Sequence, residues 1–186
     1  MKLLKKPFVA LLLSAAVVLS STLLSVNIRF GGKCRDITDG FYDGVYYNGY
    51  TQKSLSSHLK NICGYADGLV TIANNYDIDT GDLLTALDDL KLSLSYSYGY
   101  ASHIYFCYDE LLSPLNALVD QLSRTELSER DADGFVQYRS GINGAQRAME
   151  SAGYNESVRE FLRSYDQFPT DFLAELAGVE MPEYFA

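Results

Sequence analysis

The feature that most constrains this chain is an apolar run near its start, PFVALLLSAAVVLSSTLLSV, which covers residues 7–26 without one charge. A helix rises about 1.5 Å per residue, so about 20 apolar residues cross the hydrocarbon core of a bilayer. The polar residues of the run are all Ser or Thr, whose hydroxyls can bond back to the helix backbone. The sequence therefore predicts a membrane-spanning helix, with the lipid bilayer as its partner through residues 7–26.

A cleaved secretory signal is the alternative, because it has the same basic start. Its apolar part is only about 7–15 residues long and ends at an A-x-A-like site. Ser14, Ala15 and Ala16 come too early for that site, and Leu23-Leu24-Ser25-Val26 fits it poorly. We therefore expect the segment to be retained as an anchor.

Charge divides the chain near Asp36. The cations before that point are Lys2, Lys5, Lys6, Arg29, Lys33 and Arg35, and no acid accompanies them. The other nine of the 15 cations face all 24 acids, which leaves that part with a net charge of −15. Nucleic-acid binding without sequence preference needs clustered Lys and Arg, so we expect no nucleic-acid partner. We expect two parts, an anchor with basic flanks (residues 1–35) and a folded domain (residues 36–186).

Membrane orientation is weakly encoded, because Lys2, Lys5 and Lys6 balance the three cations that follow the span. An early apolar segment behind a basic start usually precedes an exported domain. We expect a single-pass protein of the cytoplasmic membrane with its domain on the outer side. The three cysteines do not decide the matter, since an odd number leaves one unpaired within a monomer.

The rest of the chain has helical spacing. We expect Gly31-Gly32 to end the membrane helix and residues 39–50 to form a linker or a frayed helix. From Ser54 onward, apolar residues step by three or four along one helix face that Asn74-Asn75-Tyr76-Asp77 would close. The residues of that face are Leu55, Leu59, Ile62, Ala66, Leu69 and Ile72.

The next segment gives two conflicting signals. Between Leu92 and Tyr100, apolar residues alternate with Ser or Gly, as in a half-buried strand. A longer window fits a helix seam, and one seam over about four heptads outweighs five alternating residues. The seam residues are Leu83, Leu87, Leu90, Leu94, Ala101, Ile104, Tyr108 and Leu111. We expect one long helix, weakened at Gly99, that ends before a loop at residues 123–127.

Ser128 starts a variant capping box with Asp131, and a further helix follows at residues 135–152. We expect that helix to continue past Gly153 through Tyr165 and to stop at Pro169. A short final helix would follow before Gly178. These elements predict an all-α bundle.

Residues 77–88 resemble the start of a calcium loop. Such a loop needs Gly at its sixth position and Glu at its twelfth, where this chain has Asp82 and Asp88. Asp79 or Thr80, followed by Asp82, suits a helix N-terminus better. We therefore favour a helix cap over a calcium site.

Catalytic and metal-binding candidates are few. His58 with Cys63 and His103 with Cys107 could form a zinc set, and Cys63 with Cys107 a disulfide, but the spacings match no known zinc motif. A Cys107 nucleophile paired with His103 lacks a third orienting group. We expect small core cysteines, and we assign no catalytic, metal-binding or cofactor-binding residue and no cofactor.

The 15 tyrosines cluster at residues 42–50 and 96–108. They could form a surface that grips a glycan or a peptide, because tyrosine joins an apolar ring to a polar tip. The alternative that we favour places most of them at the boundary or in the interior of the bundle.

The C-terminal region resembles the LemA family. Tyr154-Asn155-x-x-Val158-x-x-Phe161 is followed by Phe168-Pro169, Ala174, Gly178 and Tyr184-Phe185, which is similar to the family's ending. Upstream, Leu55-x-x-x-Leu59-x-x-Ile62-x-Gly64-Tyr65-Ala66 looks like the family's first helix motif. Leu162 and Ser56-Ser57 replace the family's usual Asn and Pro-Asn, which marks a divergent member.

This resemblance implies a single-pass bacterial membrane protein with an antiparallel four-helix bundle, and no established reaction. On physical grounds we expect Phe168-Pro169 to act as a helix stop with an aromatic plug and Tyr184-Phe185 as a tail docked on the bundle. The function that we expect is an interaction or scaffold module at the bacterial cell envelope, with a protein partner or a second copy of the chain. Alternatives are an exported binder of a small ligand or an envelope polymer, and a hydrolase-type enzyme.

Overall fold

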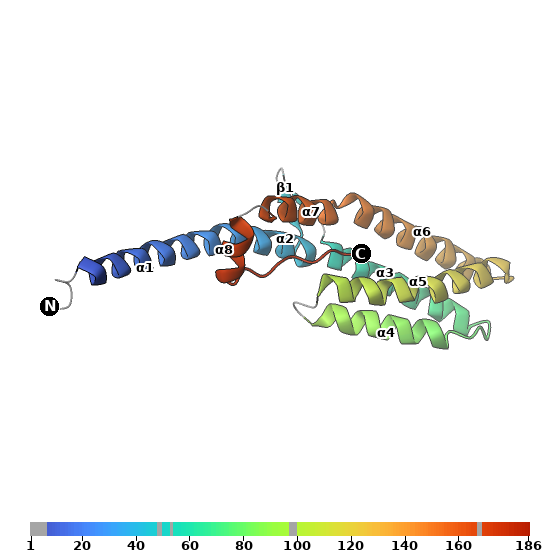
Figure 1. The fold of residues 1–186 in the computed structure, drawn as a ribbon. Helices are drawn as coiled ribbons and strands as arrows, with labels where there is room; N and C mark the ends of the chain where they lie inside the picture. The colour runs from blue at the N-terminus through green and yellow to red at the C-terminus, as the bar shows by residue number, and fades with distance from the viewer. Residues whose placement is uncertain (1–6, 48–49, 53, 97–99, 167–168) are drawn as a thin grey trace. The chain divides into compact units, whose positions relative to one another are not determined.

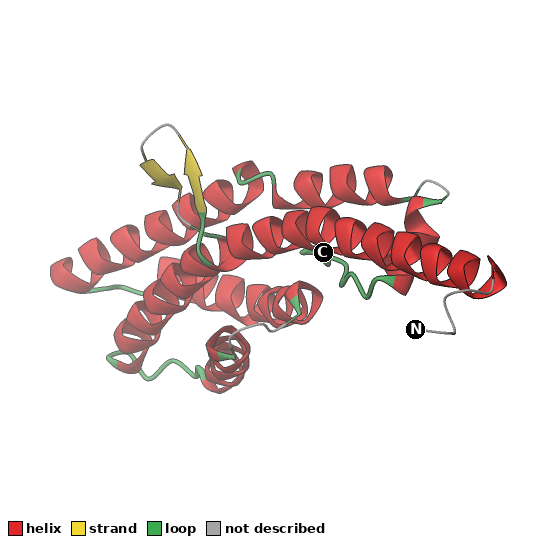
Figure 2. Cartoon of the chain, turned by 90° about the vertical axis from the view of Figure 1, so that its left-hand side faces the viewer, coloured by secondary structure: helices red, strands yellow, loops and turns green. Residues whose placement is uncertain are grey.

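The computed structural model describes residues 7–47, 50–52, 54–96, 100–166 and 169–186. Almost every described element is a helix, and the exception is one short hairpin (Figure 2). The predicted all-α class is confirmed, as is a first helix long and apolar enough to cross a membrane.

Contacts within the chain define two compact units. The first runs to Thr38 and takes in Ser157–Pro182, and the second holds Asp39–Glu156 with Glu183–Ala186. Each unit therefore contains segments that are far apart in the sequence, and each is described below by itself.

Helix α1 (Pro7–Val26) contains the apolar run and has no buried residue (Figure 1). An exposed helix that is apolar all round suits a lipid environment. Its hydroxyls bond back to the backbone as expected: Ser14 Oγ donates to the Ala10 carbonyl (2.9 Å) and Thr22 Oγ1 to the Val18 carbonyl (2.8 Å). These bonds leave α1 with few polar groups to offer to solvent.

The prediction that Gly31-Gly32 ends the membrane helix is wrong. After α1 the chain passes through a π-helical turn, η2 (Asn27–Gly31), into α2 (Gly32–Tyr42), and Gly32 has helical dihedrals (φ −60°, ψ −50°). Glycine weakens a helix by only about 1 kcal/mol, which packing can offset. The packing here comes from Phe30 and Cys34, which lie on the core of the first unit.

The region expected to be a linker or a frayed helix, residues 39–50, is described except for residues 48–49. It holds the end of α2, strand β1 (Val45–Tyr47) and the first residue of strand β2 (Tyr50–Gln52), which pairs antiparallel to β1. The predicted boundary between residues 35 and 36 lies inside α2.

Four helices share the core of the second unit: α3 (Leu55–Asn74), α4 (Gly81–Ser95), α5 (Ala101–Arg124) and α6 (Glu129–Ser151). Helix α3 packs mainly against α6 and α4 mainly against α5, and α3 also contacts α4 and α5. The largest fully buried side chains on these helices are Leu59, Ile62, Leu69, Leu87, Leu90, Ile104, Leu111, Leu115 and Leu122.

The prediction of one long helix from Leu83 to Leu111 is wrong. Helix α4 ends at Ser95, Tyr96 is extended (ψ 102°), and α5 begins at Ala101. Gly99, the expected weak point, lies outside the described residues. The eight seam residues are nevertheless all buried. The same three-and-four spacing fits two helices that pack on each other as well as it fits one, which is why the seam alone predicted the wrong connection.

Helix starts are capped at the predicted Ser128 and Asp79, and also at Ser54, which we did not predict as a cap. Ser54 Oγ accepts a bond from the Ser57 amide (3.0 Å) and Ser128 Oγ one from the Asp131 amide (3.2 Å). At the start of α4, the Gly81 amide donates to Asp79 Oδ1 (3.0 Å). These bonds satisfy amides that have no partner inside a helix.

The prediction that the helix after Ser128 continues past Gly153 is wrong. Helix α6 ends at Ser151, Gly153 adopts a positive φ (66°), and α7 (Tyr154–Tyr165) begins next. A left-handed glycine just after a helix is a common way for it to end.

The short final helix is confirmed as α8 (Thr170–Leu176), which begins directly after Pro169. Helix α7 ends at Tyr165, before that proline, and Phe168 lies outside the described residues. The core of the first unit joins α2, α7, α8 and the segment after α8 through Cys34, Phe161, Ala174 and Val179.

Candidate functional site

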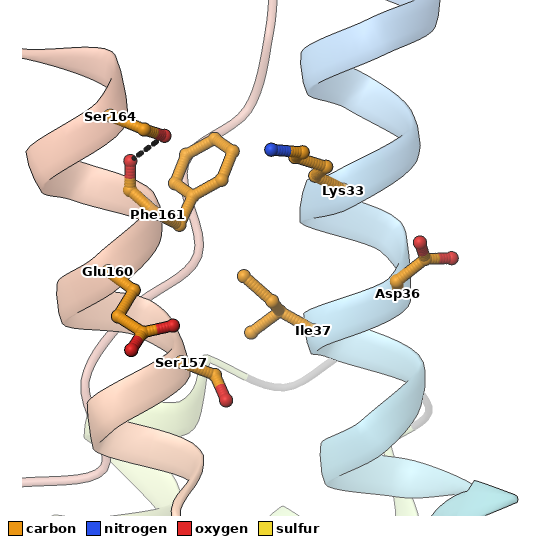
Figure 3. A pocket seen from close by; sticks show the side chains of 7 residues that line it. All are labelled: Lys33, Asp36, Ile37, Ser157, Glu160, Phe161 and Ser164. Carbon is orange, nitrogen blue, oxygen red and sulfur yellow. Dashed lines mark hydrogen bonds between the residues drawn. The ribbon is translucent and has the colours of Figure 1, made fainter.

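The first unit contains a groove between α2 and α7, with a volume of about 350 Å³ (Figure 3). Figure 3 shows Ile37 and Phe161 projecting into the gap from the two helices, with the Lys33 ammonium beside the Phe161 ring. The lining residues are Lys33, Asp36, Ile37, Ser157, Glu160, Phe161 and Ser164.

The groove combines an apolar base with mixed charge. Phe161 is buried, while Lys33, Asp36 and Glu160 are exposed. Ser164 Oγ already donates to the Phe161 carbonyl (2.7 Å), which occupies its proton. The lining contains no histidine or cysteine to activate a hydroxyl. This arrangement suits reversible binding of a small molecule with charges of both signs better than covalent catalysis.

Sequence reasoning missed the groove. Its residues have the three-and-four spacing of two helix faces, Lys33 with Ile37 and Ser157 with Phe161 and Ser164. No sequence signal pairs these two faces, because more than 100 residues separate Lys33 from Ser157.

The tail packs on the second unit as we expected, and it does so through Phe185. The Asn155 side chain forms two hydrogen bonds with the Phe185 backbone, and the Tyr154 hydroxyl donates to the Glu183 carbonyl (2.8 Å). The Phe185 ring lies 5.1 Å from that of Tyr105 and 5.7 Å from that of Phe41, between ring centroids. Tyr184 is exposed. These contacts hold the end of the chain on the second unit.

The tyrosines of the second cluster divide into two groups. Tyr105 and Tyr108 pack on the core beside Phe185, in agreement with the favoured interpretation. Tyr96 (65% exposed) and Tyr100 (71%) face outward, as do Leu92 (55%) and Phe106 (56%). These four residues, which we call the aromatic patch, lie where α4 ends and α5 begins. Of the first cluster, Tyr42 packs against Phe41, and the side chains at 45–50 lie outside the described residues.

Acidic residues flank the aromatic patch. Asp88 stands four residues before Leu92, and Asp109 and Glu110 stand three and four residues after Phe106. Residues at these spacings share a helix face, and all three acids are exposed. Exposed acids thus share helix faces with Leu92 and Phe106, the α4 and α5 members of the aromatic patch.

The structure favours neither the Cys63–Cys107 disulfide nor the Cys107 nucleophile that we considered. Cys34, Cys63 and Cys107 are free and buried, so the Cys63–Cys107 disulfide is wrong. Cys107 Sγ lies 4.0 Å from His103 Nε2, and burial raises the pKa of the Cys107 thiol, which disfavours the thiolate that a nucleophile requires. Within the described ranges, no three His, Cys, Asp or Glu side chains are grouped to hold a metal ion, which leaves out the zinc set and the calcium loop.

Comparison with known proteins places no relative beside this chain: no family model, no curated protein and no solved structure matches it. The resemblance to the LemA family therefore stays a prediction. The groove between α2 and α7 and the aromatic patch are supported by the structure alone.

Proposed function

We propose that this chain is a single-pass bacterial membrane protein whose α1 anchors a helical interaction module at the cell envelope. The observation that supports this best is the uninterrupted path of α1 through η2 into α2. Val26, in the last turn of α1, packs on the same core as Phe30 and Cys34. Cleavage at residues 23–26 would remove part of that packing, so retention of the segment fits the structure better than a cleaved signal does.

We also propose that α3, α4, α5 and α6 form an antiparallel four-helix bundle and that the chain is a divergent LemA member. Support for the bundle comes from the pairing of α3 with α6 and of α4 with α5 around one core. The domain lies on the outer side of the cytoplasmic membrane in this proposal.

Anchorage and orientation are tested together by adding proteinase K to intact cells and sequencing the N-terminus of the mature protein. Digestion of the domain in intact cells, with the residues of α1 retained in the mature chain, is the expected result. A mature N-terminus beyond Val26 would exclude anchorage through α1, and protection from protease until the cells are lysed would reverse the orientation.

The aromatic patch is the surface on which we propose that a partner protein docks. Interface centres are enriched in aromatic side chains, as this patch is, and have a polar border. Exposed acids share helix faces with Leu92 and Phe106, so the complementary partner presents an apolar surface with Lys or Arg around it. A second copy of the chain would bring two sets of these acids together, which makes self-association through this patch the less favourable choice.

Site-specific photo-cross-linking in cells tests this docking surface. A benzophenone amino acid at Phe106 is expected to give an adduct with one partner, and the adduct is expected to disappear when Leu92→Asp is added. Val136 is the matched control, because it is apolar and at least as exposed as Phe106 (65% against 56%) but lies on α6. Equal adducts from position 136 would contradict the proposal, and an adduct of twice the chain's mass would replace the partner with a second copy.

The groove between α2 and α7 favours a second candidate function, the binding of a small ligand. Its ammonium and carboxylates, set around Phe161 and Ile37, suit an amino sugar, which carries a cation and hydroxyls on an apolar ring face. Glucosamine is expected to raise the melting temperature of the detergent-solubilised protein, and Glu160→Gln to abolish the rise. Absence of any shift at millimolar glucosamine would remove this candidate.

A further inference from the structure

Helix α8 carries two large apolar side chains that its own unit does not cover. Phe172 is 59% exposed and Leu176 is 54% exposed. They stand four residues apart, so they lie on the same face of the helix. The opposite side is anchored, because Ala174 is fully buried in the core of the first unit.

The position of α8 is fixed against the membrane helix. It contacts α1, and Asn27 Nδ2 donates to the carbonyl of Ala177, directly after α8 (2.8 Å). Figure 1 shows α8 running across the line of α1. If α1 crosses a bilayer, a helix that runs across it lies close to the membrane plane.

The depth of α8 follows from the apolar surface of α1. Exposed large apolar side chains extend from Phe8 to Ile28. At about 1.5 Å per residue this stretch is about 30 Å long, the thickness of a hydrocarbon core. Arg29 and Lys33 follow as exposed cations, which suit the headgroup region. Asn27, which holds the end of α8, therefore marks the boundary between acyl chains and headgroups.

We infer that α8 is an interfacial helix whose Phe172 and Leu176 insert into the outer part of the same bilayer. This inference rests on the proposed anchorage of α1. The lipid is the occupant because α8 contacts α1, and α1 carries exposed apolar side chains up to Leu24 and Ile28. Amphipathic helices lie at this level with their apolar side chains in the boundary region. Glu175, exposed on α8, gives no attraction to anionic headgroups, so binding depends on the apolar side chains and occurs on zwitterionic lipid.

Insertion of α8, in addition to the span of α1, would fix the orientation of the first unit relative to the membrane. A single helix can tilt and rotate in a bilayer, and interfacial aromatic side chains limit both motions. With Phe172 inserted, the groove between α2 and α7 and the cations at Arg29 and Lys33 stay close to the headgroups.

The chain contains no tryptophan, so one introduced tryptophan reports on one position. The full chain would be reconstituted in phosphatidylcholine vesicles containing lipid brominated either near the headgroup end of its acyl chains or near their methyl end. Phe172→Trp and Leu176→Trp should be quenched at least about twofold more by the first lipid than by the second. Val17→Trp, in the middle of α1, should show the reverse order, and Val136→Trp should be quenched by neither lipid.

The outcomes separate this inference from the anchorage on which it rests. If Val17→Trp is quenched but Phe172→Trp and Leu176→Trp behave like Val136→Trp, α8 does not enter the bilayer. If Val17→Trp is also unquenched, the anchorage itself fails. Introducing Phe172→Glu beside Leu176→Trp is expected to abolish the quenching at position 176, and unchanged quenching there would overturn the role of Phe172.

Discussion

Asn155 and Phe185 form a reciprocal pair of hydrogen bonds. Asn155 Nδ2 donates to the Phe185 carbonyl, and the Phe185 amide donates to Asn155 Oδ1, both at 2.8 Å. The side chain of Asn155 thus satisfies the backbone of the penultimate residue in the way that a neighbouring strand would. The C-terminal residues 183–186 therefore belong to the fold of the second unit.

Asn155→Ala is expected to release the tail. Each lost hydrogen bond is worth about 0.5–1.5 kcal/mol, so the pair contributes about 1–3 kcal/mol. Amide hydrogen exchange at residues 183–186 should accelerate at least about tenfold in the variant. Asn116→Ala, at an exposed position of α5, is the control. Unchanged exchange in Asn155→Ala would show that ring packing alone holds the tail.

Phe41→Ala is expected to destabilise the second unit strongly. The Phe41 ring is 1% exposed and lies 5.2 Å from the ring of Tyr154, between centroids. Emptying such a site typically costs about 3–5 kcal/mol, measured as the free energy of unfolding in urea. Phe106→Ala removes the same side chain from an exposed position and should change stability by less than about 0.5 kcal/mol. Equal losses in the two variants would contradict the burial of Phe41.

Gly68→Ala tests the close packing of α3 on α6. A Cβ at position 68 would lie 2.6 Å from the Tyr138 ring. Displacing that ring should cost about 1–3 kcal/mol, more than the roughly 1 kcal/mol that alanine adds to helix stability. The substitution should therefore destabilise the protein, as thermal unfolding would show, but should stabilise it in a Tyr138→Ala background.

Gly144→Ala is the matched control for that cycle, because a Cβ there meets nothing within 4 Å. It should stabilise the protein by about 0.5–1 kcal/mol through helix propensity alone. A stabilising effect of Gly68→Ala in the unmodified protein would mean that Tyr138 moves aside at little cost.

Alkaline pH is expected to destabilise the second unit through Cys63. Burial raises the pKa of this thiol from 9.0 to about 11. Between those values the unfolded chain loses the proton that the folded chain keeps, so stability is fully present below pH 9.0 and falls as pH rises toward 11. The slope from this group is at most about 1.4 kcal/mol per pH unit. Urea unfolding midpoints across this range should fall less steeply for Cys63→Ala, and identical slopes would exclude the linkage.

The sequence by itself determined the local features. An uncharged run of 20 residues that enters a bilayer must bond its backbone internally, which favours a helix, and α1 is a helix over this run. The spacing of Leu83 to Leu111 fixed which side chains are buried, because helix periodicity sets the buried face whatever the helix packs against. Ser128 marked a helix start because its hydroxyl caps amides only a few residues away.

Only the tertiary structure decided where helices continue and where they turn back. Gly31-Gly32 stays helical because Phe30 and Cys34 pack on a core whose other residues come from near the chain's end. The seam from Leu94 to Ala101 is divided between two helices because α5 packs back on α4. The groove beside Phe161, the packing of the Phe185 ring on Tyr105 and the core that α8 shares with Cys34 likewise depend on contacts across more than 70 residues. Helix periodicity encodes a face but not its partner, and so these sites became visible only in the folded chain.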